Sequence, residues 1–175
     1  MKTPLVVPFC LLAGLSFAGD GAPAPGAPTR QASLAVALGS DVAGVGLSAE
    51  KYLAGGRLSV FAGAGYIFGS SDGRGATGAG AAGGLRVYSG GQKHRVFGEA
   101  SFSPVAVEVA PEGSGLRGET ISYGPGVSVG YNLVTSGGFT LALSVGVGQA
   151  VTGSSDAHGT EPLSSIALGY TWVRR

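Results

Sequence analysis

Residues 139–148 have the sequence FTLALSVGVG, in which a large apolar residue stands at every second position and a small or polar residue lies between. This period of two is typical of a β-strand whose two faces meet different surroundings. The same pattern recurs in TISYGPGVSVGYN at 120–132, where glycine is too frequent for a stable helix. Each segment is therefore predicted to be a strand with one bulky apolar face and one small-residue face.

Eight segments after residue 30 share this alternation, and the connections between them differ in kind. The predicted strands cover 32–40, 42–52, 58–68, 76–88, 94–103, 120–132, 139–151 and 165–172. Glycine pairs at 55–56, 90–91 and 137–138 follow the second, fourth and sixth strands and can supply the positive φ angles of tight hairpins. The other connections are a short one near 39–42 and the polar segments 69–75, 110–119 and 152–161. Short turns at one end and longer loops at the other are the layout of an outer-membrane barrel.

The composition favours the same class of protein. Charged residues make up 12% of the 175 residues and the net charge is +1, whereas an ordinary soluble domain carries about 25% charge. The few charges are scattered, which argues against binding nucleic acid through a basic face. The small-residue face is therefore poorly suited to water, and the apolar face is predicted to point outward into lipid. The alternative is a soluble secreted β-sandwich with the apolar face inside.

The N-terminal residues have the features of an export signal. Residues 5–18 form an apolar stretch after Lys2, and Ser16-Phe17-Ala18 places small residues before a cleavage site at Gly19. A membrane anchor is the alternative, but it needs about 20 apolar residues. We therefore expect a signal peptide at 1–18, a flexible Gly/Ala/Pro leader at 19–31 and a barrel at 32–175. Cleavage removes Cys10, so the mature chain would contain no disulfide.

Aromatic residues on the apolar phase gather near the strand ends, as the rings of a membrane barrel do at the headgroup level. Two girdles are predicted. The set near the loop end is Tyr66, Phe68, Phe102 and Tyr123, and the set near the turn end is Tyr131, Phe139, Tyr170 and Trp172.

Four charged residues within the strands have the inward phase: Glu50, Arg86, Arg95 and Glu99. If the turn at Gly90-Gly91 pairs Tyr88 with Lys93, Arg86 faces Arg95, and a carboxylate must lie between the two arginines. We therefore expect a charge network in an interior that is just large enough for side chains to fill. Phe61 and Phe97 share the inward phase and can occupy space beside facing glycines.

A local irregularity is expected in the fifth strand. Past Ser103-Pro104 the apolar phase shifts, which indicates a β-bulge. With that shift, Glu108 turns inward or stands above the membrane.

The last strand and one glycine-rich strand carry a resemblance to a known family. The chain ends in alternating residues that close on Tyr170-Thr171-Trp172, three positions before the end, and residues 123–132 have the sequence YGPGVSVGYN. These features resemble the small porin-like outer-membrane barrels (OmpA/OmpX-like and Opa-like). The resemblance implies an outer-membrane location in a Gram-negative cell and insertion by the barrel-assembly machinery. It implies no single activity, since family members include adhesins, structural proteins and lipid-modifying enzymes.

Catalytic features are sparse. The strongest set is Ser154, Ser155, Asp156, His158 and Glu161 in the last polar loop, yet residues so close along a loop seldom form a triad. We predict no catalytic, metal or cofactor site and no cofactor. The predicted fold is all-β, an eight-stranded antiparallel up-and-down transmembrane barrel.

The predicted function is that of a monomeric, non-enzymatic structural or surface-interaction barrel. Its partners would be outer-membrane lipid, the assembly machinery and an extracellular partner reached through the polar loops, with no nucleic acid. A narrow pore for small solutes is the alternative, and a lipid-modifying enzyme is the third hypothesis.

Overall fold

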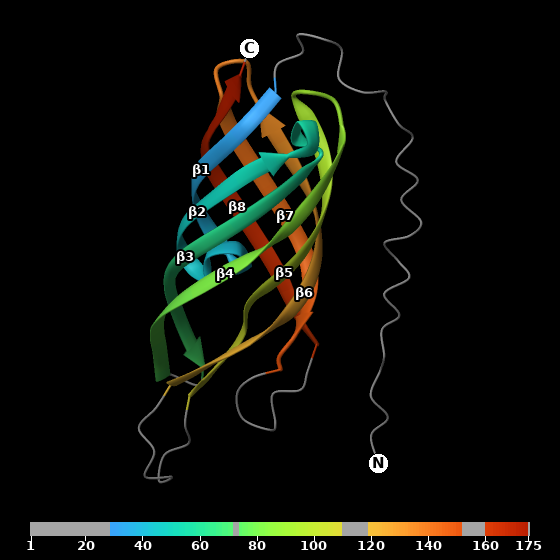
Figure 1. The fold of residues 1–175 in the computed structure, drawn as a ribbon. Coiled ribbons are helices and arrows are strands. Elements are labelled where there is room, and N and C mark those ends of the chain that lie inside the picture. The colour runs from blue at the N-terminus through green and yellow to red at the C-terminus, as the bar shows by residue number, and fades with distance from the viewer. Residues whose placement is uncertain (1–28, 72–73, 110–118, 152–159, 175) are drawn as a thin grey trace, which may run out of the picture.

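The computed structural model describes residues 29–71, 74–109, 119–151 and 160–174, and it is an all-β barrel of eight antiparallel strands (Figure 1). The strands are β1 (Thr29–Gly39), β2 (Gly44–Leu53), β3 (Leu58–Ser71), β4 (Arg74–Gly90), β5 (His94–Val109), β6 (Glu119–Val134), β7 (Phe139–Gln149) and β8 (Thr160–Arg174). Two single-turn 3₁₀ helices, η2 (Ser40–Val42) and η3 (Ala54–Gly56), connect β1 to β2 and β2 to β3. Each predicted strand corresponds to one observed strand. The first begins at Thr29, inside the segment that was expected to be leader.

The strands pair in sequence order and β1 closes the sheet against β8. The closing ladder runs from Thr29↔Arg174 to Gly39↔Ser165, with a bulge between Arg30 and Ala32. One sheet closed on itself is not the pair of stacked sheets that a β-sandwich requires. The sandwich alternative is therefore wrong.

The large aliphatic side chains point away from the barrel axis. Val36 and Val145 are 59% and 63% exposed, whereas Ala37 and Thr171, on the opposite phase, are 1% and 0% exposed. A soluble barrel places its branched side chains inside. The alternation predicted which residues share a face, and the described strands put the aliphatic face outside.

Short turns lie at the end of the barrel where β1 begins and β8 ends (Figure 1); this end is called the turn end and the opposite one the loop end. Gly55, Gly56 and Gly138 adopt positive φ angles of 67°, 86° and 90°, as predicted for two of the three glycine pairs. Of the third pair, Gly91 adopts no positive φ. The connection 91–93 is longer than a two-residue turn and therefore does not require a residue with a positive φ angle.

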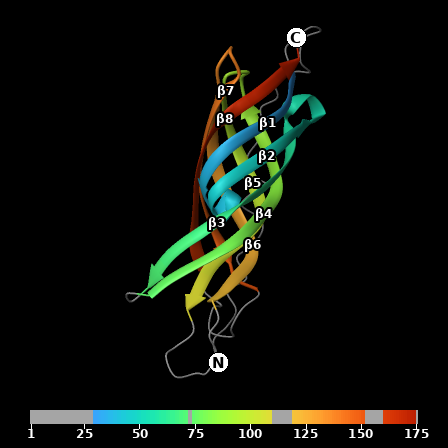
Figure 2. The same ribbon diagram turned by 90° about the vertical axis from the view of Figure 1, so that its left-hand side faces the viewer.

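The first of the polar loops is much shorter than expected. β3 and β4 continue their ladder through the 69–75 segment to Ser71↔Arg74, which leaves only 72–73 outside the described residues. Figure 2 shows this hairpin leaning away from the barrel at the loop end. The other two predicted loops lie mostly outside the described residues, which omit 110–118 and 152–159.

The connection between β1 and β2 folds into the barrel instead of projecting from it. We call residues 39–43 the inner turn. Asp41, Val42 and Ala43 within it are buried, and η2 contacts the surrounding strands. Glycines on the inner face of β3 make room for it: a Cβ at Gly63 would overlap the Asp41 carbonyl oxygen, and one at Gly65 would overlap that of Val42. The small-residue face therefore accommodates backbone as well as side chains.

The irregularity predicted after Pro104 is confirmed. The β5–β6 register shifts between Pro104 and Ala106. The side chain of Glu108 lies outside the described residues, so its predicted inward turn stays a prediction.

Seating of the inner turn is expected to depend on the absence of a side chain at Gly63. Gly63→Ala should lower the free energy of unfolding by about 1–3 kcal/mol, because the added methyl displaces the Asp41 backbone. Gly91→Ala is the matched control, since a Cβ there meets nothing within 4 Å. Urea unfolding of the refolded barrel, followed by tryptophan fluorescence, measures both. Equal stability of the two variants would contradict the inward fold of the turn.

Candidate functional site: the charged barrel interior

Arg86 lies at the centre of a buried charge cluster. Its strand β4 places it inward between Ser59 of β3 and Glu99 of β5, its partners in the two ladders. The guanidinium binds three carboxylates: Nε donates to Glu99 Oε2 at 2.8 Å, Nη1 lies 3.4 Å from Glu50 Oε2, and Nη2 pairs with Asp41 Oδ2. All four side chains are at most 7% exposed. One cation thus joins acids from β2, β5 and the inner turn.

Two aromatic rings flank the same guanidinium. Its central carbon lies 4.2 Å from the Phe61 ring centroid and 4.8 Å from that of Phe97, within the range of cation–π attraction. Each ring is paired in the ladder with a glycine of the next strand, Phe61 with Gly84 and Phe97 with Gly130. As predicted, both rings point inward and lie beside glycines.

Glu50 accepts hydrogen bonds from hydroxyl groups on four strands, β1 to β4. Its donors besides Arg86 are Ser33 (3.5 Å), Tyr52 (3.2 Å), Ser59 and Tyr88. Buried carboxylates require such compensation because the low-polarity interior no longer hydrates the charge. The cluster therefore holds its carboxylates in a fixed, fully bonded arrangement.

Asp41 ties the inner turn to the barrel wall. In addition to Arg86, its Oδ2 accepts a hydrogen bond from Ser165 Oγ of β8 at 2.8 Å. Ser165 is in turn bonded to Ser144 of β7 at 2.7 Å. The turn is thus held from both sides of the interior.

Two further arginines lie nearer the turn end and bind uncharged acceptors. Arg30 donates to Asn132 Oδ1 and to the Gln92 carbonyl oxygen, both at 2.6 Å. Arg95 donates to the carbonyl oxygens of Gly91, at 3.0 Å, and Gly56. Among the side chains that the structure describes, the buried Arg30, Arg86 and Arg95 equal in number the buried acids Asp41, Glu50 and Glu99, so their formal charges sum to zero.

The structure brings together three of the four residues predicted to form the network. Glu50, Arg86 and Glu99 meet, whereas Arg95 lies with the turn-end arginines. The expected pairing of Tyr88 with Lys93 is wrong: Tyr88 pairs with Phe97 and Arg86 with Glu99. Because the connection after Gly90 is longer than a two-residue turn, the register moves by four residues. Such a shift leaves every side chain on its predicted face.

Four interior residues were missed from the sequence, for different reasons. Asp41 lies in a connection without periodicity, and Arg30 precedes a bulge that interrupts the alternation. Tyr52 and Tyr88 follow Glu50 and Arg86 by two residues, so extending the alternation by one step would have found them. Both tyrosines are buried and their ring centroids lie 5.7 Å apart.

The predicted girdle residues lie on the outer face, and several form pairs. Tyr66 and Phe68 have ring centroids 4.9 Å apart, Phe102 and Tyr123 are stacked at 6.1 Å, and Tyr170 and Trp172 meet edge to face at 5.4 Å. Phe139 pairs with Tyr170 in the β7–β8 ladder. Tyr131 contacts His94 instead of another member of the set.

Catalytic and metal chemistry have little support among the described residues. Ser154, Ser155, Asp156 and His158 lie outside them, and Glu161 is exposed at the start of β8. In the described part of the chain no group of His, Cys, Asp and Glu residues is arranged to hold a metal ion. The same residues contain no helix long and apolar enough to span a membrane.

Comparison with known proteins adds no family. No family model matches the chain, and neither the curated proteins nor the solved structures include a match. The class that the fold defines is therefore an eight-stranded antiparallel β-barrel.

Removal of Arg86 is expected to leave three buried carboxylates without their shared cation. Arg86→Met should destabilise the barrel by about 3–5 kcal/mol, and Glu99→Gln should cost less in the Arg86→Met background than in the wild type. A double-mutant cycle from urea unfolding measures this coupling, expected to be about 0.5–3 kcal/mol. Pairing Arg86→Met with Glu161→Gln is the control, since Glu161 is exposed on β8. Additive effects of Arg86→Met and Glu99→Gln would contradict the cluster.

Proposed function

We propose that this chain is an integral outer-membrane protein, exported by its N-terminal signal peptide, whose barrel spans the membrane as a monomer. The observation that carries the proposal is the outward aliphatic face around a polar, charged interior. Each of the eight strands carries a leucine or valine side chain that is at least 40% exposed: Leu34, Leu47, Val60, Leu85, Val96, Val129, Val145 and Leu168. Water disfavours so continuous an apolar surface, whereas acyl chains accept it.

The outer aromatic residues support the same orientation. Phe68 and Trp172, near opposite ends of the barrel, are 68% and 48% exposed, and aromatic rings prefer the membrane interface. The alternation of β8, which carries Tyr170 and Trp172 on its outer face, resembles the strand that the assembly machinery binds in outer-membrane barrels. We propose that the turn end faces the periplasm and the loop end the cell exterior.

The filled interior supports a structural or surface-interaction role without enzymatic activity. Arg86 and its two flanking rings occupy the middle of the barrel, and the inner turn lies beside them. The polar segments 110–119 and 152–161 would then contact partners outside the cell. The two strand pairs that carry them, β5–β6 and β7–β8, each supply a partner to the interior network, Glu99 from β5 and Ser165 from β8.

A charge on the outer face distinguishes a membrane barrel from a soluble one. Val145→Arg should destabilise the barrel folded into lipid vesicles by about 2–4 kcal/mol if the position lies in lipid, whereas a position in water would tolerate the charge. Gln149→Arg, exposed at the loop end of the same strand, should cost about 0–1 kcal/mol. Heat-modifiable gel mobility and outer-membrane fractionation report correct insertion. A protein that fractionates as soluble, or a Val145→Arg variant as stable in vesicles as the wild type, would contradict the proposal.

Conductance separates the structural role from the pore alternative. We expect the purified protein to leave planar bilayers at background current, because the cluster of Arg86 with its three carboxylates closes the interior. Steady channels whose conductance changes on Glu99→Gln would favour the narrow pore. Recordings from a heat-unfolded sample control for leakage caused by detergent.

A further inference from the structure

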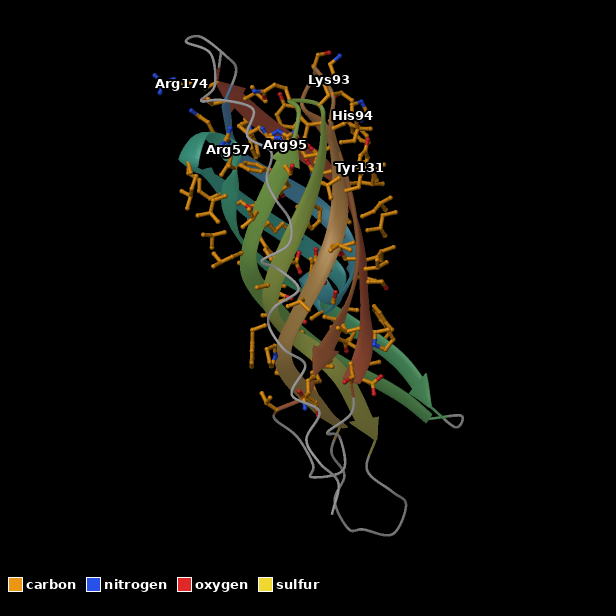
Figure 3. All side chains as sticks on the ribbon, turned by 90° about the vertical axis from the view of Figure 1, so that its right-hand side faces the viewer. Arg57, Lys93, His94, Arg95, Tyr131 and Arg174 are labelled. Carbon is orange, nitrogen blue, oxygen red and sulfur yellow. The ribbon has the colours of Figure 1, made fainter. Side chains whose placement is uncertain are left out.

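The exposed basic side chains among the described residues gather at one end of the barrel. Lys51, Arg57, Lys93 and Arg174 are exposed at the turn end, and Figure 3 shows Arg57, Lys93, His94 and Arg174 gathered there. Among the described residues, no exposed Asp or Glu accompanies them at this end. The sequence of the loop end, by contrast, contains Asp72, Glu108, Glu112, Glu119, Asp156 and Glu161 against Arg74 and Arg117. The turn end is therefore suited to an anionic partner.

One part of this end combines basic and hydrogen-bonding groups. Lys93 and His94 are exposed where β5 begins, and His94 Nδ1 is hydrogen-bonded to the Tyr131 hydroxyl of β6. When that hydroxyl donates to Nδ1, the ring carries its proton on Nε2, which can then donate to an anion. Lys93 adds a point charge next in sequence. A phosphate group offers oxygens for both.

The same tyrosine lines an apolar groove. It has a volume of about 740 Å³ and crosses the outer face along one ladder row. The row runs Val96, Tyr131, Leu143, Ile166 and Leu38, from β5 through β6, β7 and β8 to β1. Small residues such as Gly130 and Ser144 lie beside the row. Four strand spacings of about 4.8 Å give a length of roughly 19 Å, comparable to the depth of one leaflet, about 15 Å.

We propose that the Lys93–His94–Tyr131 edge and this groove together bind one phospholipid with an anionic headgroup. The headgroup phosphate lies against Lys93 and His94, and an acyl chain follows the row from Tyr131 toward Leu38. This inference rests on the proposed membrane function and goes beyond it, since a membrane barrel needs only nonspecific contact with lipid. The basic edge gives the site its preference for an anionic headgroup, and the groove fixes where the acyl chain of that lipid lies.

The test compares lipids that remain bound to the folded, detergent-solubilised protein. The protein is offered equal amounts of phosphatidylglycerol and phosphatidylcholine with identical acyl chains, and native mass spectrometry counts each bound lipid. We expect phosphatidylglycerol to be retained over phosphatidylcholine. Lys93→Gln with His94→Gln should reduce that preference about fivefold or more, the loss expected for one cation near an anionic lipid. If the double variant fails to fold, the same lipid preference is measured on the single variant Lys93→Gln.

Two further variants separate the headgroup from the groove. Lys51→Gln removes an exposed cation at the same end but on β2, away from the groove, and should leave the preference unchanged. Leu143→Trp, which fills the middle of the groove with an apolar side chain, should reduce retention of both lipids.

The outcomes that overturn the lipid site differ from those that overturn the proposed function. An unchanged preference in the Lys93/His94 variant, or an equal loss with Lys51→Gln, overturns the site in favour of diffuse attraction or none. A wild-type protein that inserts into vesicles but retains both lipids equally overturns only the lipid site. A protein that does not insert overturns the membrane function and the lipid site with it.

Discussion

The narrow interior of an eight-stranded barrel limits which side chains can face one another, and most features of this protein follow from that limit. Such an interior is just wide enough for side chains to fill. Phe61, Arg86 and Phe97 come from three consecutive strands and occupy much of it, and each ring faces a glycine on one neighbouring strand, Gly84 beside Phe61 and Gly130 beside Phe97. Gly130 illustrates the constraint, because a Cβ there would overlap the Phe97 ring. The high glycine content is thus a packing requirement of the bulky residues.

Charge within this interior helps to select the register of β4 against β5. A slip of two residues keeps every side chain on its face, so alternation by itself does not select one register. The ion pair between Arg86 and Glu99 does select it, since a slipped strand would leave a carboxylate buried without its cation. Glu50 and its hydroxyl donors hold β2 in the same way. The cluster therefore contributes specificity where the hydrophobic pattern contributes none.

The sequence predicted the strands and their faces because both depend on local periodicity. Leu141, Leu143 and Val145 show the period of two directly, and the outward position of Val145 follows from the lack of charge on the opposite phase. The register after Gly90 depends on the length and conformation of one turn, which periodicity does not contain. Asp41 was missed because its burial results from the inner turn meeting Arg86, a contact between residues 45 positions apart. Interior residues were thus predictable on regular strands and unpredictable at turns and bulges.

The position of Asp41 has a consequence for how the chain folds. Its partners are Arg86 of β4 and Ser165 of β8, the latter 124 residues away. The first hairpin therefore cannot reach its final shape when its two strands pair, and has to wait for the last strand to join the first. Contacts between such distant positions form slowly because the intervening chain must first be ordered. Strand-by-strand growth thus ends in one concerted step, in which the seam closes and the earliest connection settles into place.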